Sequence, residues 1–240
     1  MIEKNFFSGI TDLLSIILFG SKAREEEDQF SDVDIFLLVE DVCQKKMQDI
    51  ITVVEKELPF ENIGISIYKK SIYNKMLQEG SIFLWHLKLE GKIIYKKSNI
   101  NLYRDLKPFK KFDDNLNIYK NIYENTKNSL KKNGVNIFDL SQLFFVCRNL
   151  CLLTCFKLDK PTFGRTSVYF KLSEYIGLLP LKVENYSFLS KCRLNYTRGT
   201  GLEFEYPDNK NLLVILKQIE SLLKVCEEII KNGGAYSEHR

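Results

Sequence analysis

The fold of this chain is constrained most by two apolar, strand-like runs. They are joined through a glycine-serine pair and a spaced pair of aspartates. The first run ends at Gly20-Ser21, and ten residues beyond Ser21 the segment Ser31-Asp32-Val33-Asp34 leads into the second run, Ile35 to Val39. Residues two apart in an extended strand point to the same face of a sheet. We therefore expect Asp32 and Asp34 on one face, at the start of a strand.

The residue types in this segment favour binding of a cation and a phosphate. Two carboxylates on one face repel each other unless a cation lies between them. Mg²⁺ prefers such oxygen ligands and usually binds one or two carboxylates together with substrate phosphates. A glycine lets the backbone approach a phosphate closely, and a serine hydroxyl and nearby amides donate hydrogen bonds to it. The alternative is a polar hairpin with acidic residues kept for solubility, which leaves an aspartate pair at a strand start unexplained.

The segments Gly20-Ser21-Lys22-Ala23-Arg24 and Ser31-Asp32-Val33-Asp34 together resemble the nucleotidyltransferase superfamily that includes the DNA polymerase β-like enzymes. The likeness is to its minimal and antibiotic-modifying branches. This resemblance implies that Asp32 and Asp34 are catalytic ligands of two Mg²⁺ ions. It also implies contacts from the Gly-Ser turn to a nucleoside triphosphate, with ATP as the expected one. The candidate nucleotide-binding residues are Gly20, Ser21, Lys22, Arg24 and Ser31, with a solvated-turn role as an equal alternative for Lys22 and Arg24.

The chain departs from the family pattern at a third carboxylate, which the resemblance places on the next strand. That strand is predicted at Ile63 to Tyr68, and the expected acidic position holds Ser66 or its neighbour. Glu61, just before the strand, is a doubtful substitute. A positioned general base contributes about 10²–10⁴-fold to a rate. Three outcomes stay open: a base supplied from the helical second part of the chain, a slow enzyme, or a domain that binds nucleotide without turnover.

The first part of the chain alternates strand and helix patterns. Continuous apolar runs indicate strands in the middle of a covered sheet, and apolar residues at helical spacing indicate amphipathic helices. The predicted strands are Leu14–Phe19, Val33–Val39, Ile63–Tyr68 and Lys92–Tyr95, and the predicted helices are Lys45–Leu58, Ser71–Gln78 and Ile82–Glu90.

The second part of the chain is helical throughout. Five helices are predicted, at Leu116–Lys132, Asp139 or Ser141 to Leu158, Thr166–Ile176, Asn185–Leu194 and Asn211–Lys231, with a loop over residues 195–208. Either Asp139 or Ser141 is a candidate N-cap of the second helix. The predicted fold class is α+β. A small mixed-sheet nucleotidyltransferase domain at residues 1–98 is followed by an all-α helical bundle at residues 108–235.

Composition narrows the classes of protein. A hydrophobic content of 45% supports a packed core. No apolar stretch approaches the roughly 20 residues that cross a membrane, and the N-terminus does not have the pattern of a signal peptide. Of the six cysteines, Cys147, Cys151 and Cys155 recur every four residues along one helix face. We interpret them as small apolar residues of a reduced core, typical of a cytoplasmic protein.

Several other residues have sequence contexts that favour structural or surface roles. The lysine-rich stretch 107–132 is interpreted as a solvated helix face, with a basic wall facing a triphosphate as the alternative. His86 is interpreted as a partly buried helix residue and Trp85 as a core residue. Arg148 is followed by Asn149 and an apolar run without histidine, so a nuclease of the toxin–antitoxin type is not expected. Arg165 and Arg198 are interpreted as surface or structural arginines, with contact to phosphates as the alternative.

The leading hypothesis is a Mg²⁺-dependent nucleotidyltransferase that moves a nucleoside monophosphate to a hydroxyl acceptor. The expected acceptor is an antibiotic-like small molecule or a protein side chain. The resemblance also makes a homodimer a candidate assembly for this chain. The competing hypothesis is a non-catalytic nucleotide-binding or interaction module, similar to a toxin–antitoxin regulator. Polymerisation onto nucleic acid is disfavoured, because a net charge of +4 and the absence of a recognisable nucleic-acid-binding motif give it little support.

Overall fold

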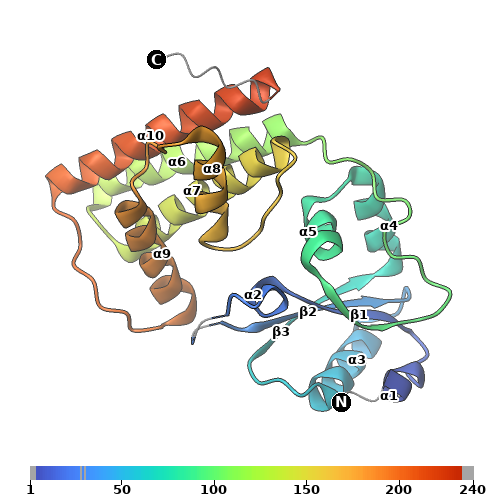
Figure 1. Cartoon of the computed structure of the whole chain (residues 1–240). Coiled ribbons are helices and arrows are strands. Elements are labelled where there is room, and N and C mark those ends of the chain that lie inside the picture. Colours follow the sequence, from blue (N-terminus) through green and yellow to red (C-terminus); the bar gives the residue numbers. More distant parts are fainter. Residues whose placement is uncertain (1–3, 28, 30, 234–240) are drawn as a thin grey trace. The chain divides into compact units, whose positions relative to one another are not determined.

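The computed structural model describes residues 4–27, 29 and 31–233, and its contacts divide the chain into two compact units, Met1–Lys110 and Lys111–Arg240 (Figure 1). The first unit is built on a four-stranded mixed sheet and the second unit is helical. The predicted α+β class is therefore confirmed. That residues 1–98 and 108–235 are separate domains remains a prediction. The last two residues of the second range, 234 and 235, lie outside the described residues.

The sheet of the first unit consists of β1 (Leu13–Phe19), β2 (Val33–Val39), β3 (Ile63–Lys69) and β4 (Lys92–Lys96) in the order β3-β2-β1-β4. Strand β1 pairs antiparallel with β2 and β4, whereas β2 pairs parallel with β3. All four predicted strands are present. The two continuous apolar runs are the two central strands, because only a central strand is covered on both faces and on both edges.

Helices cover both faces of this sheet (Figure 1). Helices α1 (Lys4–Ser8) and α3 (Gln44–Glu57) share one apolar core with the sheet. Helices α4 (Lys70–Glu79) and α5 (Ile82–Glu90) contribute to the core on the opposite face. The alternating pattern of β3 fits this arrangement, because Ile63, Ile65 and Ile67 all pack against the first of these cores.

A short helix, α2 (Gly20–Arg24), follows β1 directly where the sequence indicated only a turn. Five residues are too few to show a helical period, so neither α2 nor α1 was predicted. The helix ends at Glu25, which has a left-handed conformation with φ 61°. The backbone N–H groups of the cap donate to the carbonyl oxygens of Ser21 and Lys22, which closes the turn tightly.

The second unit contains the five predicted helices, α6 (Phe112–Asn133), α7 (Ile137–Lys157), α8 (Ser167–Ile176), α9 (Val183–Arg198) and α10 (Asn209–Asn232). Helix α9 extends to Arg198, so the predicted loop over residues 195–208 is wrong for its first four residues. Helix α7 begins at Ile137, and its N-cap is Asn136, whose Oδ1 accepts from the backbone N of Asp139 at 2.9 Å. The expected caps Asp139 and Ser141 are therefore wrong, because asparagine caps as well as aspartate and stands earlier.

Helix α7 is the core helix of the second unit. It is long and apolar enough to cross a membrane by length and composition, but most of its apolar stretch is buried inside the unit. Cys147, Cys151 and Cys155 are free thiols and fully buried on this helix, beside Cys226 of α10. Burial raises the pKa of the Cys155 thiol to about 12. The interpretation of these cysteines as inert core residues is confirmed.

Candidate functional site

Asp34 lies between the end of β1 and the start of β3. In the antiparallel pairing it stands opposite Phe19, the residue before Gly20. In the parallel pairing it stands opposite Gly64. The sheet register therefore brings the Gly-Ser turn, Asp34 and the first residues of β3 together.

Gly20 packs directly against the carboxylate of Asp34. Its φ is +73°, and a Cβ built on it would lie 2.0 Å from Oδ2 of Asp34. A side chain at this position would collide with the carboxylate and would also require a left-handed backbone that only glycine adopts freely. The local fold thus requires glycine here, and the turn begins in contact with the aspartate.

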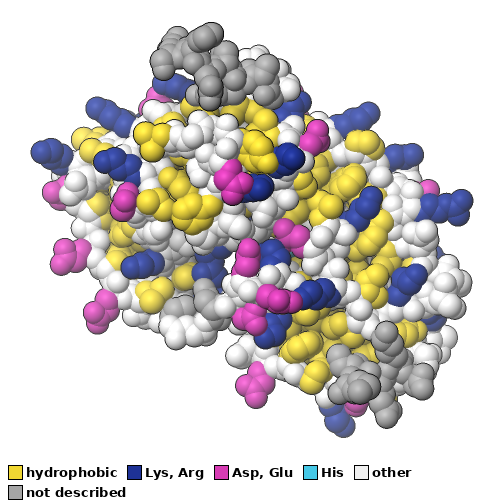
Figure 2. Space-filling model, in the orientation of Figure 1, with side chains coloured by type: hydrophobic (Ala, Val, Ile, Leu, Met, Phe, Trp, Pro, Cys, Tyr) yellow, Lys and Arg dark blue, Asp and Glu magenta, His cyan; other side chains and the backbone are white. Residues whose placement is uncertain are grey.

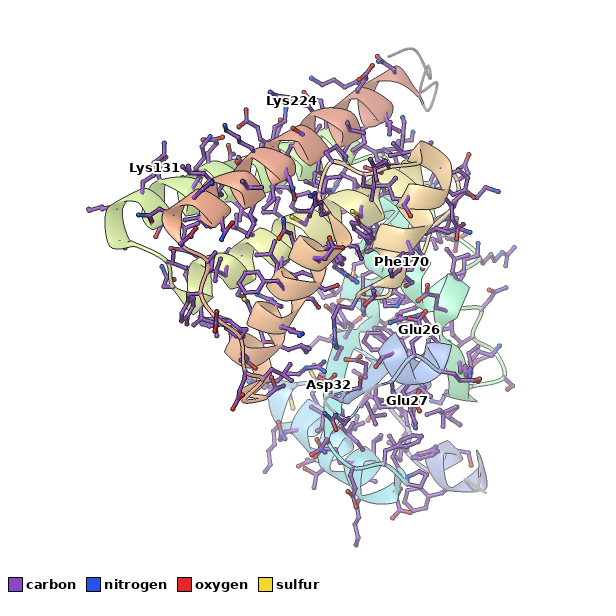
Figure 3. All side chains as sticks on the ribbon, turned by 60° about the vertical axis from the view of Figure 1, so that its left-hand side comes forward. Glu26, Glu27, Asp32, Lys131, Phe170 and Lys224 are labelled. Carbon is purple, nitrogen blue, oxygen red and sulfur yellow. The ribbon has the colours of Figure 1, made fainter. Side chains whose placement is uncertain are left out.

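Gly64 marks the place toward which both aspartates point. A Cβ built on Gly64 would lie 3.9 Å from Oδ2 of Asp32 and 3.9 Å from Oδ1 of Asp34. These are ordinary van der Waals distances, so a side chain fits there. The two carboxylates therefore lie on the same side of the sheet, as the two-residue spacing predicts. Figure 3 shows Asp32 within the first unit, at the approach to β2.

The register also locates the place of the third carboxylate. Ser66 stands opposite Phe36, two residues beyond the pairing of Gly64 with Asp34. The position on β3 that faces the aspartate pair is thus held by Gly64, two residues before Ser66, so the expectation of Ser66 or its neighbour at this position is wrong. Glu61 is exposed and precedes the strand. Sequence alternation could not separate Ser66 from Gly64, because both point to the same face.

The donor set fits a hard divalent cation only in part. Carboxylate oxygens are the ligands that Mg²⁺ prefers, and the aspartate pair offers them from one side. Among the described residues, no group of three or more His, Cys, Asp or Glu side chains is placed to hold a metal ion. A cation at the pair would therefore complete its shell with substrate phosphates and water.

The other predicted nucleotide-binding residues lie close to the turn in sequence. Ser21 and Ser31 are half-buried. Lys22 is exposed, and its Nζ lies 2.7 Å from Oε1 of Glu27. Glu26 and Glu27 follow α2 on the surface of the first unit (Figure 3).

Arg24 is the exception among these residues, because its side chain is mostly buried. Its Nη1 donates to Oε2 of Glu90 at 2.9 Å and lies 3.5 Å from Nε2 of His86. Its Nε donates to Glu26 at 2.8 Å. Glu90 stands 66 residues away in the sequence, so no local spacing could have pointed to it.

Two residues of α5, His86 and Trp85, differ in how they match expectation. His86 is half-buried, as predicted, with its Nε2 3.2 Å from Oε2 of Glu90. Trp85 is also half-buried rather than a core residue, and its indole Nε1 donates to the carbonyl oxygen of Lys107. The expectation of a core tryptophan is wrong, because the ring is partly exposed and Nζ of Lys88 lies over it, 4.6 Å from its centroid.

Two lysines of α6 pair with carboxylates inside the second unit. Lys120 lies 2.5 Å from Glu227, and Lys127 lies 3.9 Å from Glu220, both on α10. Lysine and acidic side chains are interspersed on the visible face of this unit (Figure 2). This arrangement agrees with a solvated face. Arg148 of α7 donates to Oδ1 of Asn149 and to the carbonyl oxygen of Phe163.

Comparison with known proteins identifies the class. Residues 3–100 match the family model described as Polymerase beta, Nucleotidyltransferase. A protein of Methanocaldococcus jannaschii named "Putative protein adenylyltransferase" is 37% identical over 86 residues, which span 32% of this chain and 87% of that protein. The chain belongs to the polymerase β nucleotidyltransferase family. It is a nucleotidyltransferase.

Two solved structures show a weaker likeness. Spectinomycin adenyltransferase AAD(9) from Enterococcus faecialis, solved with ATP and spectinomycin, has 14% identity and a TM-score of 0.47, covering 88% of this chain and 92% of that chain. A nucleotidyltransferase-like protein from Exiguobacterium sibiricum has 12% identity and a TM-score of 0.40, covering 96% and 75%. Likenesses this low transfer no ligand or substrate to this chain.

Proposed function

We propose that this enzyme transfers an adenylyl group from ATP to a hydroxyl acceptor in a Mg²⁺-dependent reaction. The observation that carries the proposal is the packing of Gly20 against Asp34, with Asp32 and Asp34 converging on the place beside Gly64. A turn that lets the backbone approach a phosphate closely is thereby joined to a carboxylate pair suited to a hard cation.

Each residue of the site has a distinct proposed role. Asp32 and Asp34 hold Mg²⁺, and the family resemblance favours two ions. When bound, the metal stabilises the charge that develops on the transferring phosphoryl group. The Ser21 hydroxyl and the backbone amides of the turn bind and orient the triphosphate. Gly20 keeps these groups against Asp34, because no larger residue permits the approach.

The acceptor proton is removed by a group other than a carboxylate on β3. Gly64 occupies the place that faces the aspartate pair, and it is exposed. The open place beside Gly64 admits an acceptor hydroxyl close to both aspartates. Asp32 and Asp34 affect the acceptor hydroxyl only as neighbouring charges. The group that removes its proton therefore belongs to the acceptor molecule or to another part of this chain.

A protein side-chain hydroxyl is the preferred acceptor. The relative from Methanocaldococcus jannaschii carries the name of a protein adenylyltransferase, which supports both an adenylyl donor and a protein acceptor. An antibiotic-like small molecule is the second candidate. All six cysteines are free, which supports a reducing compartment such as the cytoplasm.

The competing proposal is a module that binds nucleotide without turnover, and Gly64 is the observation that favours it. One experiment separates the two. The full chain is incubated with Mg²⁺ and ATP, GTP, CTP or UTP labelled at the α-phosphate, together with a cell lysate or a panel of aminoglycosides. Wild-type protein is expected to label an acceptor from ATP, and Asp32→Asn is expected to label none.

The matched control is Glu40→Gln, at the opposite end of β2 from the aspartate pair, where Glu40 pairs with Lys70 at 3.1 Å. This variant loses one carboxylate of the same unit and should transfer label like wild type. Saturable ATP binding by wild type without any transfer would support the non-catalytic module and overturn the enzymatic proposal.

A further inference from the structure

The Gly-Ser turn is held from both of its ends by two side chains of α5. Before the turn, the ring of Phe19 contacts His86 edge to face, with ring centroids 5.6 Å apart. After the turn, Nη1 of Arg24 donates to Oε2 of Glu90 at 2.9 Å. The two α5 residues also contact each other, because Nε2 of His86 lies 3.2 Å from Oε2 of Glu90.

This network is shielded from solvent. The side chains of Arg24, Glu90 and His86 are 13%, 15% and 14% exposed. Removing Glu90 leaves the mostly buried guanidinium of Arg24 with only the more exposed carboxylate of Glu26 as a counter-charge, which is more damaging than the loss of a surface pair. Burial alone raises the pKa of Glu90, but the hydrogen bonds from His86 and Arg24 outweigh it and hold the pKa below its ordinary value.

The turn needs such support because α2 is only five residues long. A helix this short does not form by itself, since its nucleation cost is not repaid by propagation. Ala23 is buried in the core that the sheet shares with α3, and the next residue, Arg24, reaches to α5. Two consecutive side chains thus fix α2 to opposite faces of the sheet.

We propose that Glu90 and His86 are positioning residues of the nucleotide-binding turn, and that Arg24 acts through them rather than as a phosphate contact. The proposal rests on the proposed function of the same site. The guanidinium of Arg24 is engaged by two carboxylates, those of Glu26 and Glu90. The network holds Gly20 and Ser21 where the backbone meets Asp34, so its loss is expected to weaken triphosphate binding.

The variant Glu90→Gln separates positioning from direct contact. If Arg24 binds phosphate, removing the competing carboxylate leaves ATP affinity unchanged or increases it. If the network positions the turn, the same variant weakens binding. We expect the dissociation constant and KM for Mg·ATP to rise on the order of tenfold, about 1.4 kcal/mol, with a smaller change in kcat. Calorimetry on the full chain and the label-transfer assay measure these quantities.

A matched control exists on the same segment. Glu25, the residue after Arg24, pairs with Lys92 at 2.7 Å, but the two side chains are 82% and 52% exposed. Such surface pairs contribute little, so Glu25→Gln should bind Mg·ATP like wild type. Equal losses in Glu25→Gln and Glu90→Gln would overturn the proposal, because burial of the network would then be irrelevant.

A second variant covers the case in which Glu90→Gln fails to fold. His86→Gln removes the imidazole that contacts Phe19 and Glu90 but keeps the Arg24–Glu90 ion pair. It should raise KM in the same direction while retaining a cooperative thermal transition. Wild-type affinity in both variants overturns the positioning role alone. Absence of Mg·ATP binding in wild-type protein overturns the proposed function, and the positioning role with it.

Discussion

Two glycines face the same aspartate pair, and they differ in what they permit. Gly20 has φ +73°, and a Cβ on it would lie 2.0 Å from Asp34, whereas a Cβ on Gly64 would lie 3.9 Å from both aspartates. The β1 side of the carboxylates is closed by backbone, and the β3 side is open. One glycine is therefore required by the local structure, and the other leaves space that a side chain could fill.

The difference separates two parts of the site. On the closed side, Gly20 packs against Asp34 with no room for a side chain, which suits the binding of a constant group such as a triphosphate. On the open side, β3 presents only Gly64 to the carboxylates, with room for a Cβ at 3.9 Å from each, which suits entry of a variable acceptor. The predictions below test each side, from the largest expected effect to the smallest.

The aspartate that both glycines face should be the most sensitive position. Asp34→Asn preserves shape and removes the charge, and a metal ligand stabilises the transition state by several kcal/mol. We expect label transfer from ATP to fall by about 10³-fold, since each 1.36 kcal/mol is tenfold in rate. Transfer within a few-fold of wild type, measured with a folded variant, would remove Asp34 from the mechanism.

The closed side should tolerate no side chain. Gly20→Ala places a methyl group against the carboxylate and forces alanine into a left-handed backbone, which costs about 1–3 kcal/mol. We expect a lower thermal unfolding midpoint and a dissociation constant for Mg·ATP that rises by about tenfold or more. An unchanged midpoint with unchanged affinity would show that the turn is not packed as described.

The open side should accept a side chain and gain from a carboxylate. Gly64→Asp adds a third acidic group where a general base contributes about 10²–10⁴-fold. We expect transfer to rise at least about tenfold. Because like charges repel without a cation, the variant should also be stabilised by Mg²⁺ more than wild type. Gly64→Asn is the uncharged control, and an equal gain in both variants would contradict a role for charge.

The support of the closed side should depend on pH in a defined direction. The folded-state pKa of Glu90 lies below its ordinary value of 4.5. A carboxylate with a lowered pKa stabilises the fold above its unfolded-state pKa, and that contribution disappears as the pH falls through the folded-state value. The stability difference between wild type and Glu90→Gln should be present at pH 7 and shrink below about pH 4.5. Denaturant titrations measure it, and a difference that grows in acid would reverse the assignment.

The two sides of the site also differ in how far the sequence could predict them. The closed side follows from local information, because an apolar run ending in Gly20-Ser21 and a second run beginning at Asp34 pair as neighbouring strands. The open side depends on the register between β2 and β3, which sets Gly64 opposite Asp34. A period of two cannot choose between Gly64 and Ser66, since both point to one face.

The sequence likewise could not predict contacts between segments that lie far apart along the chain. The pairing of Arg24 with Glu90 depends on how α5 packs over the sheet, and nothing in the spacing indicates it. The predicted helix ends were inaccurate for a different reason. Asn136 caps the start of α7, and Gly199, in a left-handed conformation, follows the end of α9. Several residues of suitable type compete at each end, and only tertiary packing selects among them.

The central claim is that the aspartate pair beside the Gly-Ser turn transfers an adenylyl group. The most direct test follows two labels in parallel, one at the α-phosphate and one at the γ-phosphate of ATP, with the full chain and Mg²⁺. The account predicts that the α label reaches the acceptor, that the γ label leaves in pyrophosphate, and that Asp32→Asn abolishes both. Transfer of the γ label, or full transfer by Asp32→Asn, would contradict it.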